Sequence, residues 1–252
     1  MINDWIRVIA AAVLSVDFRR WLRMQQWRYR LQWPRVGTVN PNNLWRVKPI
    51  SRIFGLNRGL PIDRYYIEQF LSEHASDIQG RVLELGDNFY TQKFGGDRVT
   101  KSDVLHMVEN NPKATIVADL TCADHVPSDI FDCIIFIQTL QMIYDTRAAV
   151  RHLYRILKPT GVLLVTSHGI SKIGRREGID PWGEYWRLTA QSARRLFEEA
   201  FPAGNIRIKT YGNVLTAIAS LHGLSAEELR QEELDHCDPD FEVLITIRGI
   251  KP

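Results

Sequence analysis

Four acidic residues and one glycine lie within or just after short apolar segments of the sequence. They are Glu84, Gly86, Asp87, Asp103 and Asp119. A glycine at the end of a strand lets a ligand approach the backbone without meeting a Cβ atom. A carboxylate after the next strand accepts hydrogen bonds from both hydroxyl groups of a ribose. The order of these residues predicts a binding site for an adenosyl cofactor, with all five as cofactor-binding candidates.

The two later aspartates have separate expected roles. Asp103 comes 17 residues after Gly86, at the expected end of a second strand, and is the candidate for the ribose hydroxyls. Asp119 follows a third strand and is placed to accept a hydrogen bond from the adenine amino group. An aspartate in such a position also suits the cap of a turn or helix, so the order of the strand ends carries the prediction.

His168 and Gln138 are candidates for contacts near the reacting group. His168 follows an apolar strand, and an imidazole of ordinary pKa suits a general base near neutral pH. The alternative is a loop histidine without a catalytic role. Gln138 ends the preceding strand and is a candidate for binding the cofactor, with an acceptor contact as the alternative.

A group of aromatic and basic residues after the fifth strand suits the binding of an acceptor. It consists of Trp182, Tyr185, Trp186 and Arg187. Aromatic faces stack on sugar rings, and a guanidinium binds sugar oxygens or a phosphate. Packing of a lid explains these residues equally well. No metal site is predicted, because the nearby histidine and aspartate pairs do not complete a ligand set.

The elements that position these residues alternate along the chain. Strands are predicted at 81–85, 98–100, 115–118, 133–137, 162–166, 206–211 and 241–248, and helices at 62–71, 146–157, 192–201, 214–221 and 226–234. This alternation predicts an α/β fold, namely a Rossmann-like, doubly wound, mostly parallel seven-stranded sheet with an N-terminal helical arm. In such a sheet ligands bind beyond the carboxyl ends of the strands.

Residues 1–60 differ in charge from the domain expected at 61–252. They contain 11 Lys and Arg against 2 Asp and Glu, and a helix is predicted near 5–31. One interpretation is an accessory helical arm that packs its tryptophans on the core. The alternative is peripheral contact with an anionic membrane surface or an acidic partner through residues 1–35. Nucleic-acid binding is not expected, because basic charge alone is non-specific.

The composition is that of an ordinary globular chain, with 252 residues, 45% hydrophobic and 24% charged. The three cysteines lack CxxC spacing, and Cys133 lies in an apolar segment, which favours a reducing, cytoplasmic location. The apolar segment 8–14 is shorter than the ~20 residues that span a bilayer. It follows Asp4 instead of a basic region, so no signal peptide is expected.

Over about residues 62–212 the sequence resembles the class I methyltransferases that use S-adenosylmethionine. The likeness includes Val82-Leu83-Glu84-Leu85-Gly86, Asp103, Ala118-Asp119-Leu120, Phe131-Asp132-Cys133-Ile134-Ile135 and the lysine–proline turn within 153–164. This resemblance implies S-adenosylmethionine as the cofactor and methyl transfer as the reaction. The sequence departs from the family at 87–89, where further glycines are usual.

Segments 59–68 and 182–187 also look like a methyltransferase subgroup often found beside glycosyltransferases. That likeness implies O-methylation of a sugar-containing or other hydroxylated small acceptor. Two alternatives stay open. One is an NAD-dependent oxidoreductase in which Asp103 holds the NAD ribose, although a GxGxxG motif is absent. The other is a non-catalytic interaction module that keeps the fold.

Overall fold

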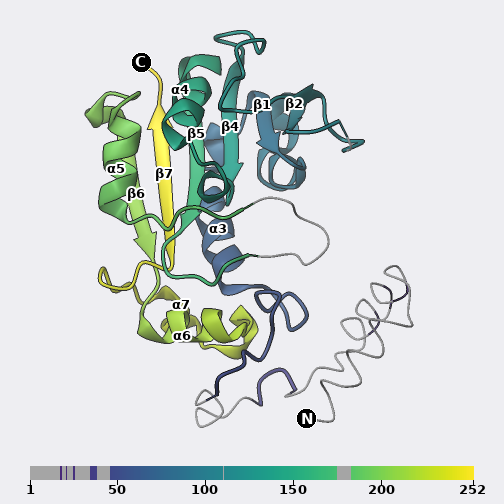
Figure 1. Ribbon diagram of the computed structural model, residues 1–252, viewed down its shortest axis with the longest axis vertical. Helices are drawn as coiled ribbons and strands as arrows, with labels where there is room; N and C mark the ends of the chain where they lie inside the picture. Colours follow the sequence, from purple (N-terminus) through teal and green to yellow (C-terminus); the bar gives the residue numbers. More distant parts are fainter. Residues whose placement is uncertain are drawn as a thin grey trace. The chain divides into compact units, whose positions relative to one another are not determined.

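The computed structural model describes Phe18, Trp21, Gln25 and the ranges 35–38, 46–109, 111–174 and 183–252 (Figure 1). The helix predicted near 5–31 and the candidate Trp182 lie outside these residues. Within the part that is described, no helix is both long enough and apolar enough to cross a membrane.

A seven-stranded sheet forms the centre of the larger part of the chain, in the order β3-β2-β1-β4-β5-β7-β6. Its strands are β1 (Gly80–Leu85), β2 (Val99–His106), β3 (Ile116–Val117), β4 (Phe131–Ile137), β5 (Leu157–His168), β6 (Ile206–Tyr211) and β7 (Leu244–Ile250). Strand β7 runs antiparallel to both of its neighbours, β5 and β6, and the other strand pairs are parallel. This arrangement confirms the predicted Rossmann-like, mostly parallel α/β fold.

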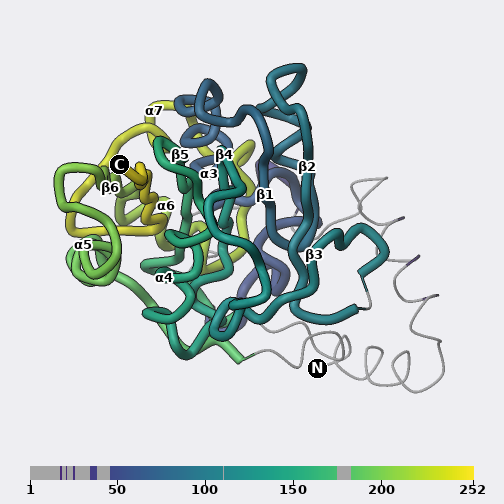
Figure 2. Tube along the Cα trace, turned by 90° about the horizontal axis from the view of Figure 1, so that it is seen from above, coloured from purple at the N-terminus to yellow at the C-terminus, as the bar shows by residue number. Residues whose placement is uncertain are grey.

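Within the described residues from 46 onward, five α-helices accompany these strands. They are α3 (Ile62–Glu73), α4 (Thr146–Ile156), α5 (Ala190–Glu198), α6 (Val214–His222) and α7 (Gln231–Asp235). Helices α4 and α5 pack beside each other on one face of the sheet and α3 lies on the other face. Seen from above, β5, β4, β1 and β2 follow one another in a row (Figure 2). Because both faces are covered, the central strand β4 is a nearly continuous apolar segment, and Cys133 is buried there as expected.

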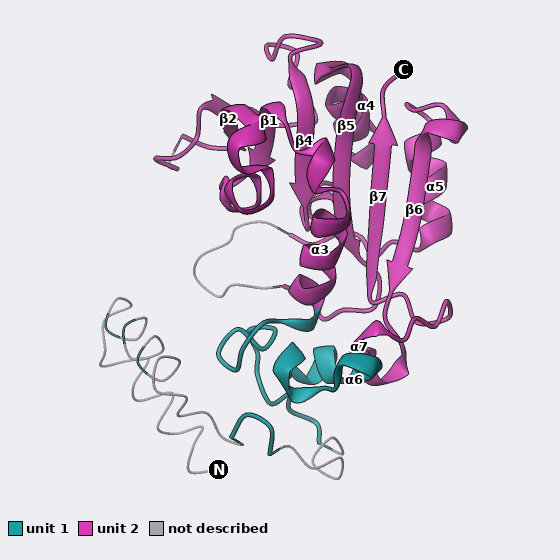
Figure 3. Cartoon of the chain, turned by 180° about the vertical axis from the view of Figure 1, so that it is seen from behind, with its two compact units in different colours: residues 1–62, 218–233 teal, residues 63–217, 234–252 magenta. Residues whose placement is uncertain are grey.

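The chain divides into two compact units (Figure 3). Unit 1 contains residues 1–62 and 218–233, and unit 2 contains 63–217 and 234–252. Residues 218–233, which the predicted division assigns to the second domain, therefore group with the N-terminal residues. A backbone hydrogen bond from Ala226 to Leu60 and a buried ion pair between Arg58 and Glu228 join these two stretches.

Several predicted boundaries were wrong. The second strand was expected at 98–100 but extends to His106, because the apolar residues after the polar segment 100–103 continue the ladder with β1. Strand β5 begins at Leu157, so the predicted lysine–proline turn lies within it and Thr160 has a φ of 64°. The helix predicted at 226–234 is a short 3-10 turn followed by α7.

Candidate cofactor and acceptor site

The site lies in unit 2, at the edge of the sheet formed by the carboxyl ends of the parallel strands. Strands β1 and β4 are neighbours there, and the chain order of the strands reverses between them. Their register pairs Glu84 with Ile135, so Gly86 and Gln138 both lie just beyond this pair of strands. This is the switch point at which doubly wound sheets bind their ligands.

Glu84 organises the loop after β1 from inside the protein. Its buried carboxylate accepts hydrogen bonds from the backbone N–H groups of Tyr90 and Thr91, at 3.2 and 2.7 Å, and from the Thr91 hydroxyl at 2.7 Å. Burial raises the pKa of Glu84, and these hydrogen bonds partly counter that effect. The geometry supports a positioning role for Glu84 in shaping the loop.

Gly86 leaves open space in front of the loop. It has a φ of 77°, and a Cβ atom added to it would meet no atom within 4 Å. Its N–H donates to Leu105 O at 2.9 Å, and its carbonyl accepts from Asn111 Nδ2 at 2.7 Å. The backbone is therefore fixed and accessible, which fits the close approach of an adenosyl or amino-acid group.

Asp87 faces the loop that follows β2. Both of its carboxylate oxygens accept hydrogen bonds from Lys113 Nζ at 3.0 Å. The hydrogen bond from Lys113 lowers the pKa of Asp87. This exposed ion pair, together with the Asn111–Gly86 bond, joins the loops that follow β1 and β2.

Asp103 does not lie at the end of its strand, so its predicted position was wrong. It pairs with Leu83 in the middle of the β1–β2 ladder. Its carboxylate accepts hydrogen bonds from Arg81 Nε at 2.7 Å and from the Thr115 hydroxyl at 2.9 Å. Burial raises the pKa of Asp103, but the hydrogen bonds from Arg81 and Thr115 outweigh it, and the pKa is lowered. The geometry therefore gives Asp103 a structural role.

The first carboxylate beyond the end of β2 belongs to Glu109, which is exposed. Sequence reasoning missed Glu109, because the strand was expected to end early. The signal that would have identified it is the apolar pair Val104-Leu105, which extends the strand and moves its end past His106.

Asp119 lies two residues beyond β3, at the expected edge. Its Oδ1 accepts hydrogen bonds from the Thr121 N–H and the Thr121 hydroxyl, both at 2.8 Å. The capping role that the sequence left open is therefore present in the structure. Contact with an adenine amino group stays a prediction.

Gln138 presents a hydrogen-bond donor that nothing in the described residues satisfies. Its Nε2 atom is buried and has no partner there. A glutamine relay fixes the amide: Ser167 Oγ donates to Gln141 Oε1 at 3.3 Å, and Gln141 Nε2 donates to Gln138 Oε1 at 3.1 Å. Because Oε1 is used as an acceptor, Nε2 is the free end of the amide. Gln138 also has a φ of 49°, a conformation that non-glycine residues rarely adopt.

His168 is the last residue of β5 and pairs with Leu244. Burial lowers its pKa to about 3, and the positive charges of Arg187 and Lys172 add to this effect. The expectation that His168 titrates near neutral pH was therefore wrong. The imidazole is neutral at physiological pH and is a weak base.

An exposed aromatic cluster lies next to the glutamine relay, formed by Tyr144, Tyr185 and Trp186. These side chains are 70%, 54% and 39% exposed. Tyr144 stacks on Trp186 with ring centroids 5.8 Å apart and meets Tyr185 edge-on at 5.4 Å. The Tyr185 N–H donates to Gln141 O at 2.8 Å, which fixes the cluster beside the relay.

Two further observations concern the residues predicted around this cluster. The structure adds Tyr144, which sequence reasoning missed because it is distant in the chain from 182–187. Arg187, a predicted substrate contact, instead donates to Lys172 O at 2.8 Å and forms an ion pair with Glu184 at 3.3 Å. Its guanidinium therefore holds the segment that carries Tyr185 and Trp186.

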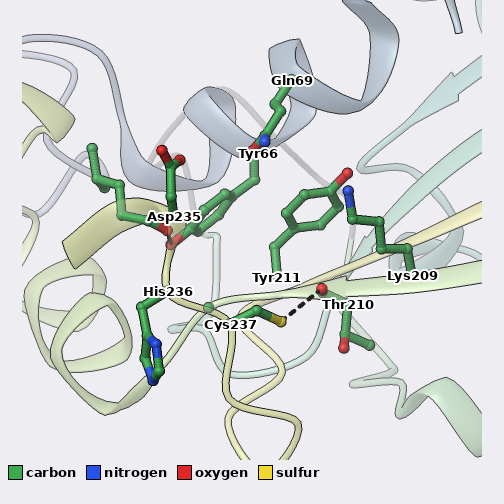
Figure 4. A pocket seen from close by; sticks show the side chains of 10 residues that line it. Tyr66, Gln69, Lys209, Thr210, Tyr211, Asp235, His236 and Cys237 are labelled. Carbon is green, nitrogen blue, oxygen red and sulfur yellow. Dashed lines mark hydrogen bonds between the residues drawn. The ribbon is translucent and has the colours of Figure 1, made fainter. Parts of the chain in front are cut away.

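A separate small cavity lies between α3 and the end of β6 (Figure 4). Tyr66 and Tyr211 stack there with centroids 5.4 Å apart, and Cys237 Sγ donates to Thr210 O at 3.3 Å. The cavity volume is about 80 Å³. The residues that line it come from α3, 209–212 and 234–237, with none from the loops after β1 and β4, so this cavity is separate from the candidate site.

Within the described ranges, no group of three or more His, Cys, Asp or Glu side chains is arranged to hold a metal ion.

A family model described as a methyltransferase domain matches residues 68–201, which is more than half of the chain. No curated protein matches the sequence. The chain belongs to this methyltransferase-domain family. The predicted resemblance to class I methyltransferases is thereby confirmed, and S-adenosylmethionine is the cofactor that goes with it.

Several solved structures are similar to this chain. A SAM-dependent methyltransferase from Archaeoglobus fulgidus is 12% identical with a TM-score of 0.49, covering 75% of this chain and 94% of that one. An S-adenosylmethionine-dependent methyltransferase from Mesorhizobium loti is 15% identical with a TM-score of 0.49, covering 75% and 98%. The cyclase SpnF is 16% identical with a TM-score of 0.47, covering 72% and 80%. Similarity at these identities and TM-scores does not show which reaction this protein catalyses.

Proposed function

We propose that the protein transfers a methyl group from S-adenosylmethionine to an oxygen of a sugar-containing or similar hydroxylated small acceptor. The observation that supports this most is the unsatisfied donor of Gln138, at the switch point between the open backbone of Gly86 and the exposed aromatic cluster. A buried donor without a partner costs about 1–3 kcal/mol, so its retention favours a ligand that supplies the missing acceptor.

The cofactor half of the proposed site lies around Gly86. The open space in front of its backbone accommodates the cofactor, and Glu84 holds the loop in place through Tyr90 and Thr91. Asp119 and Glu109 lie beyond the next strand ends, where they are available to the polar groups of the nucleoside. Asp87, engaged by Lys113, fixes the loop.

The acceptor half lies at β4 and β5. The side chains of Tyr144 and Tyr185 are exposed, and such rings suit the apolar face of a sugar ring. Trp186 Nε1 donates to the carbonyl oxygens of Ile143 and Tyr144, at 3.0 and 3.2 Å, so the cluster is fixed before a ligand binds. A rigid aromatic surface loses little entropy on binding.

When bound, S-adenosylmethionine supplies a sulfonium methyl group that is already a reactive electrophile. Methyl transfer would form the C–O bond to the acceptor oxygen as the C–S bond breaks, would leave that bond's electron pair on sulfur, and would release the hydroxyl proton to solvent. The protein contributes alignment of the two substrates and exclusion of water. The low pKa of His168 argues against a role as the final proton acceptor.

Two other functions were left open by the sequence. The NAD-dependent alternative relied on Asp103, which the structure places inside the sheet and pairs with Arg81 and Thr115. The non-catalytic alternative predicts cofactor binding without turnover. No observation in the described residues favours either one.

Calorimetry and an activity assay test the proposal together. We expect S-adenosylhomocysteine to bind at one site per chain and NAD not to bind. Incubation with S-adenosylmethionine and a panel of glycosides should yield a methyl ether that mass spectrometry detects. Absence of S-adenosylhomocysteine binding would overturn the proposed cofactor site, and binding without methylation of any hydroxylated acceptor would support the non-catalytic alternative.

A further inference from the structure

Unit 1 presents large aliphatic side chains to solvent. Ile53, Leu56, Ile218 and Leu221 are 45%, 37%, 40% and 41% exposed. We call these four residues the aliphatic set. Ile218 and Leu221 lie about one turn apart on α6, whereas Ala219 between them is buried. In this part of α6 the large residues face outward and the small one inward, which reverses the usual arrangement of a surface helix.

The segment that carries Ile53 and Leu56 packs against the end of α6. The N–H groups of Ile50 and Ser51 both donate to His222 O, at 2.9 and 3.0 Å. The backbones approach so closely that a Cβ atom on Gly223 would lie 2.4 Å from Ser51 O. The aliphatic set therefore belongs to two neighbouring segments of one compact unit.

The exposure of these residues is not a sign of loose packing in unit 1. Arg58 and Glu228 form an ion pair whose side chains are almost completely buried. Burial raises the pKa of Glu228, but the hydrogen bonds from Arg58 and from the Ser225 N–H outweigh it and lower the pKa. The side chains around this pair exclude solvent from it, so the aliphatic set belongs to a unit with a packed interior.

The charge and aromatic content of the same unit indicate what this surface contacts. Residues 1–60 carry 11 Lys and Arg against 2 Asp and Glu, and five of the seven tryptophans of the chain. Among the described residues, Arg46 and Arg52 are exposed, and Arg52 adjoins Ile53. Aliphatic side chains, tryptophans and excess cations together are the composition that binds the surface of an anionic bilayer. A second copy of the chain would bring the same cations face to face.

We propose that unit 1 docks the protein on an anionic lipid surface. The aliphatic set enters the headgroup region, and Arg46 and Arg52 contact lipid phosphates. This inference rests on unit 1 alone and does not depend on the activity proposed for unit 2.

Co-sedimentation of the full chain with lipid vesicles tests the proposal. The vesicles contain phosphatidylcholine alone or phosphatidylcholine with one third phosphatidylglycerol. We expect binding to the anionic vesicles, weakened by salt, and little binding to the neutral ones. The variant Ile218→Ser/Leu221→Ser should lower the partition coefficient about ten-fold, because two aliphatic side chains no longer enter the headgroups.

A pair of charge variants provides the matched comparison. Arg46→Gln/Arg52→Gln removes two charges from unit 1 and should lower binding to anionic vesicles about thirty-fold, since each basic residue contributes about 1 kcal/mol near such a surface. Arg194→Gln/Arg207→Gln removes two exposed charges from unit 2 and should change binding less than about two-fold. Melting curves confirm that each variant is folded.

Three results would overturn the proposal. The first is no binding of the full chain to anionic vesicles. The second is equal loss of binding in both charge variants, which would assign the effect to net charge. The third is a wild-type dimer, seen by light scattering without lipid, that Ile218→Ser/Leu221→Ser converts to a monomer, because this would assign the aliphatic set to a second copy.

Discussion

The two halves of the ligand-binding edge of the sheet differ in how their polar groups are used. At β1, β2 and β3 the carboxylates of Glu84, Asp87, Asp103 and Asp119 all accept hydrogen bonds from the protein itself. At β4 and β5 the Gln138 amide has an unsatisfied donor and the aromatic cluster is exposed. The comparison indicates that the half at β1–β3 supplies a fixed backbone, and that the half at β4 and β5 supplies side chains that are still available to bind a ligand.

The largest effect on ligand binding should come from a substitution at Gly86, in the fixed backbone after β1. Gly86→Ala puts a methyl group into the open space at the loop and should weaken S-adenosylhomocysteine binding at least about ten-fold, since the ligand approaches the backbone there. Gly96→Ala is the matched control, because Gly96 also has a positive φ and open space in front of it. Both variants should lose a similar ~1–2 kcal/mol of stability. Calorimetry that shows equal binding in the two would contradict the placement of the cofactor.

A second substitution, at the half of the site formed by β4 and β5, should lower activity without lowering stability. Gln138→Leu removes the unsatisfied donor, so the free protein should be as stable as the wild type or more so. The catalytic efficiency kcat/KM should fall about ten-fold or more, because the ligand loses a hydrogen bond from the neutral amide and is no longer aligned by it. A large drop in the melting temperature with unchanged turnover would show that Gln138 is a structural residue.

A smaller effect is expected at the aromatic cluster. Tyr144→Ala removes the most exposed ring and should raise KM for the acceptor about three- to ten-fold, since one aromatic contact is worth about 0.5–1.5 kcal/mol. The affinity for S-adenosylhomocysteine should not change. The matched control is Phe89→Ala, which also removes an exposed aromatic ring but in the loop after β1. A KM effect of Phe89→Ala alone would move the acceptor away from β4 and β5.

The smallest effect concerns pH. Burial lowers the pKa of His168 to about 3, so its charge does not change between pH 5 and 8, and it adds no inflection to the pH profile of kcat. In the unfolded chain the histidine takes up a proton below about pH 6.5. Its neutral burial therefore stabilises the fold above that pH, and this contribution is lost as the pH falls toward 3. The melting temperature of the wild type should fall more steeply with acid than that of His168→Asn, and parallel curves would contradict the assignment.

The sequence was sufficient for the elements whose pattern is local. The apolar segment of β4 and the amphipathic helix α4 with its cap, in which Ala148 N donates to Asp145 Oδ1 at 2.9 Å, could be located from residue types alone. Asp103 was misplaced because the strand was expected to end at the polar segment 100–103, whereas Val104 and Leu105 continue it in its pairing with β1.

The open half of the site could be predicted only in part. Gln138 was identified by its place after β4, but its free donor depends on Gln141 and Ser167, whose contacts form only in the folded sheet. Tyr144 and Trp186 are 42 residues apart in the chain, and only the fold brings them together, with Trp186 Nε1 donating to Tyr144 O. The pKa of His168 follows from burial, which residue type does not reveal.

The most direct test of the account is the NMR signal of the Gln138 side-chain amide. The signal is assigned by its absence in Gln138→Leu and is followed while S-adenosylhomocysteine and then a glycoside acceptor are added. The account predicts that the Nε2 protons shift and become protected from exchange when the site is filled. Saturation of the protein with both ligands, shown by calorimetry, without any change in this signal would contradict the claim that the unsatisfied donor belongs to the binding site.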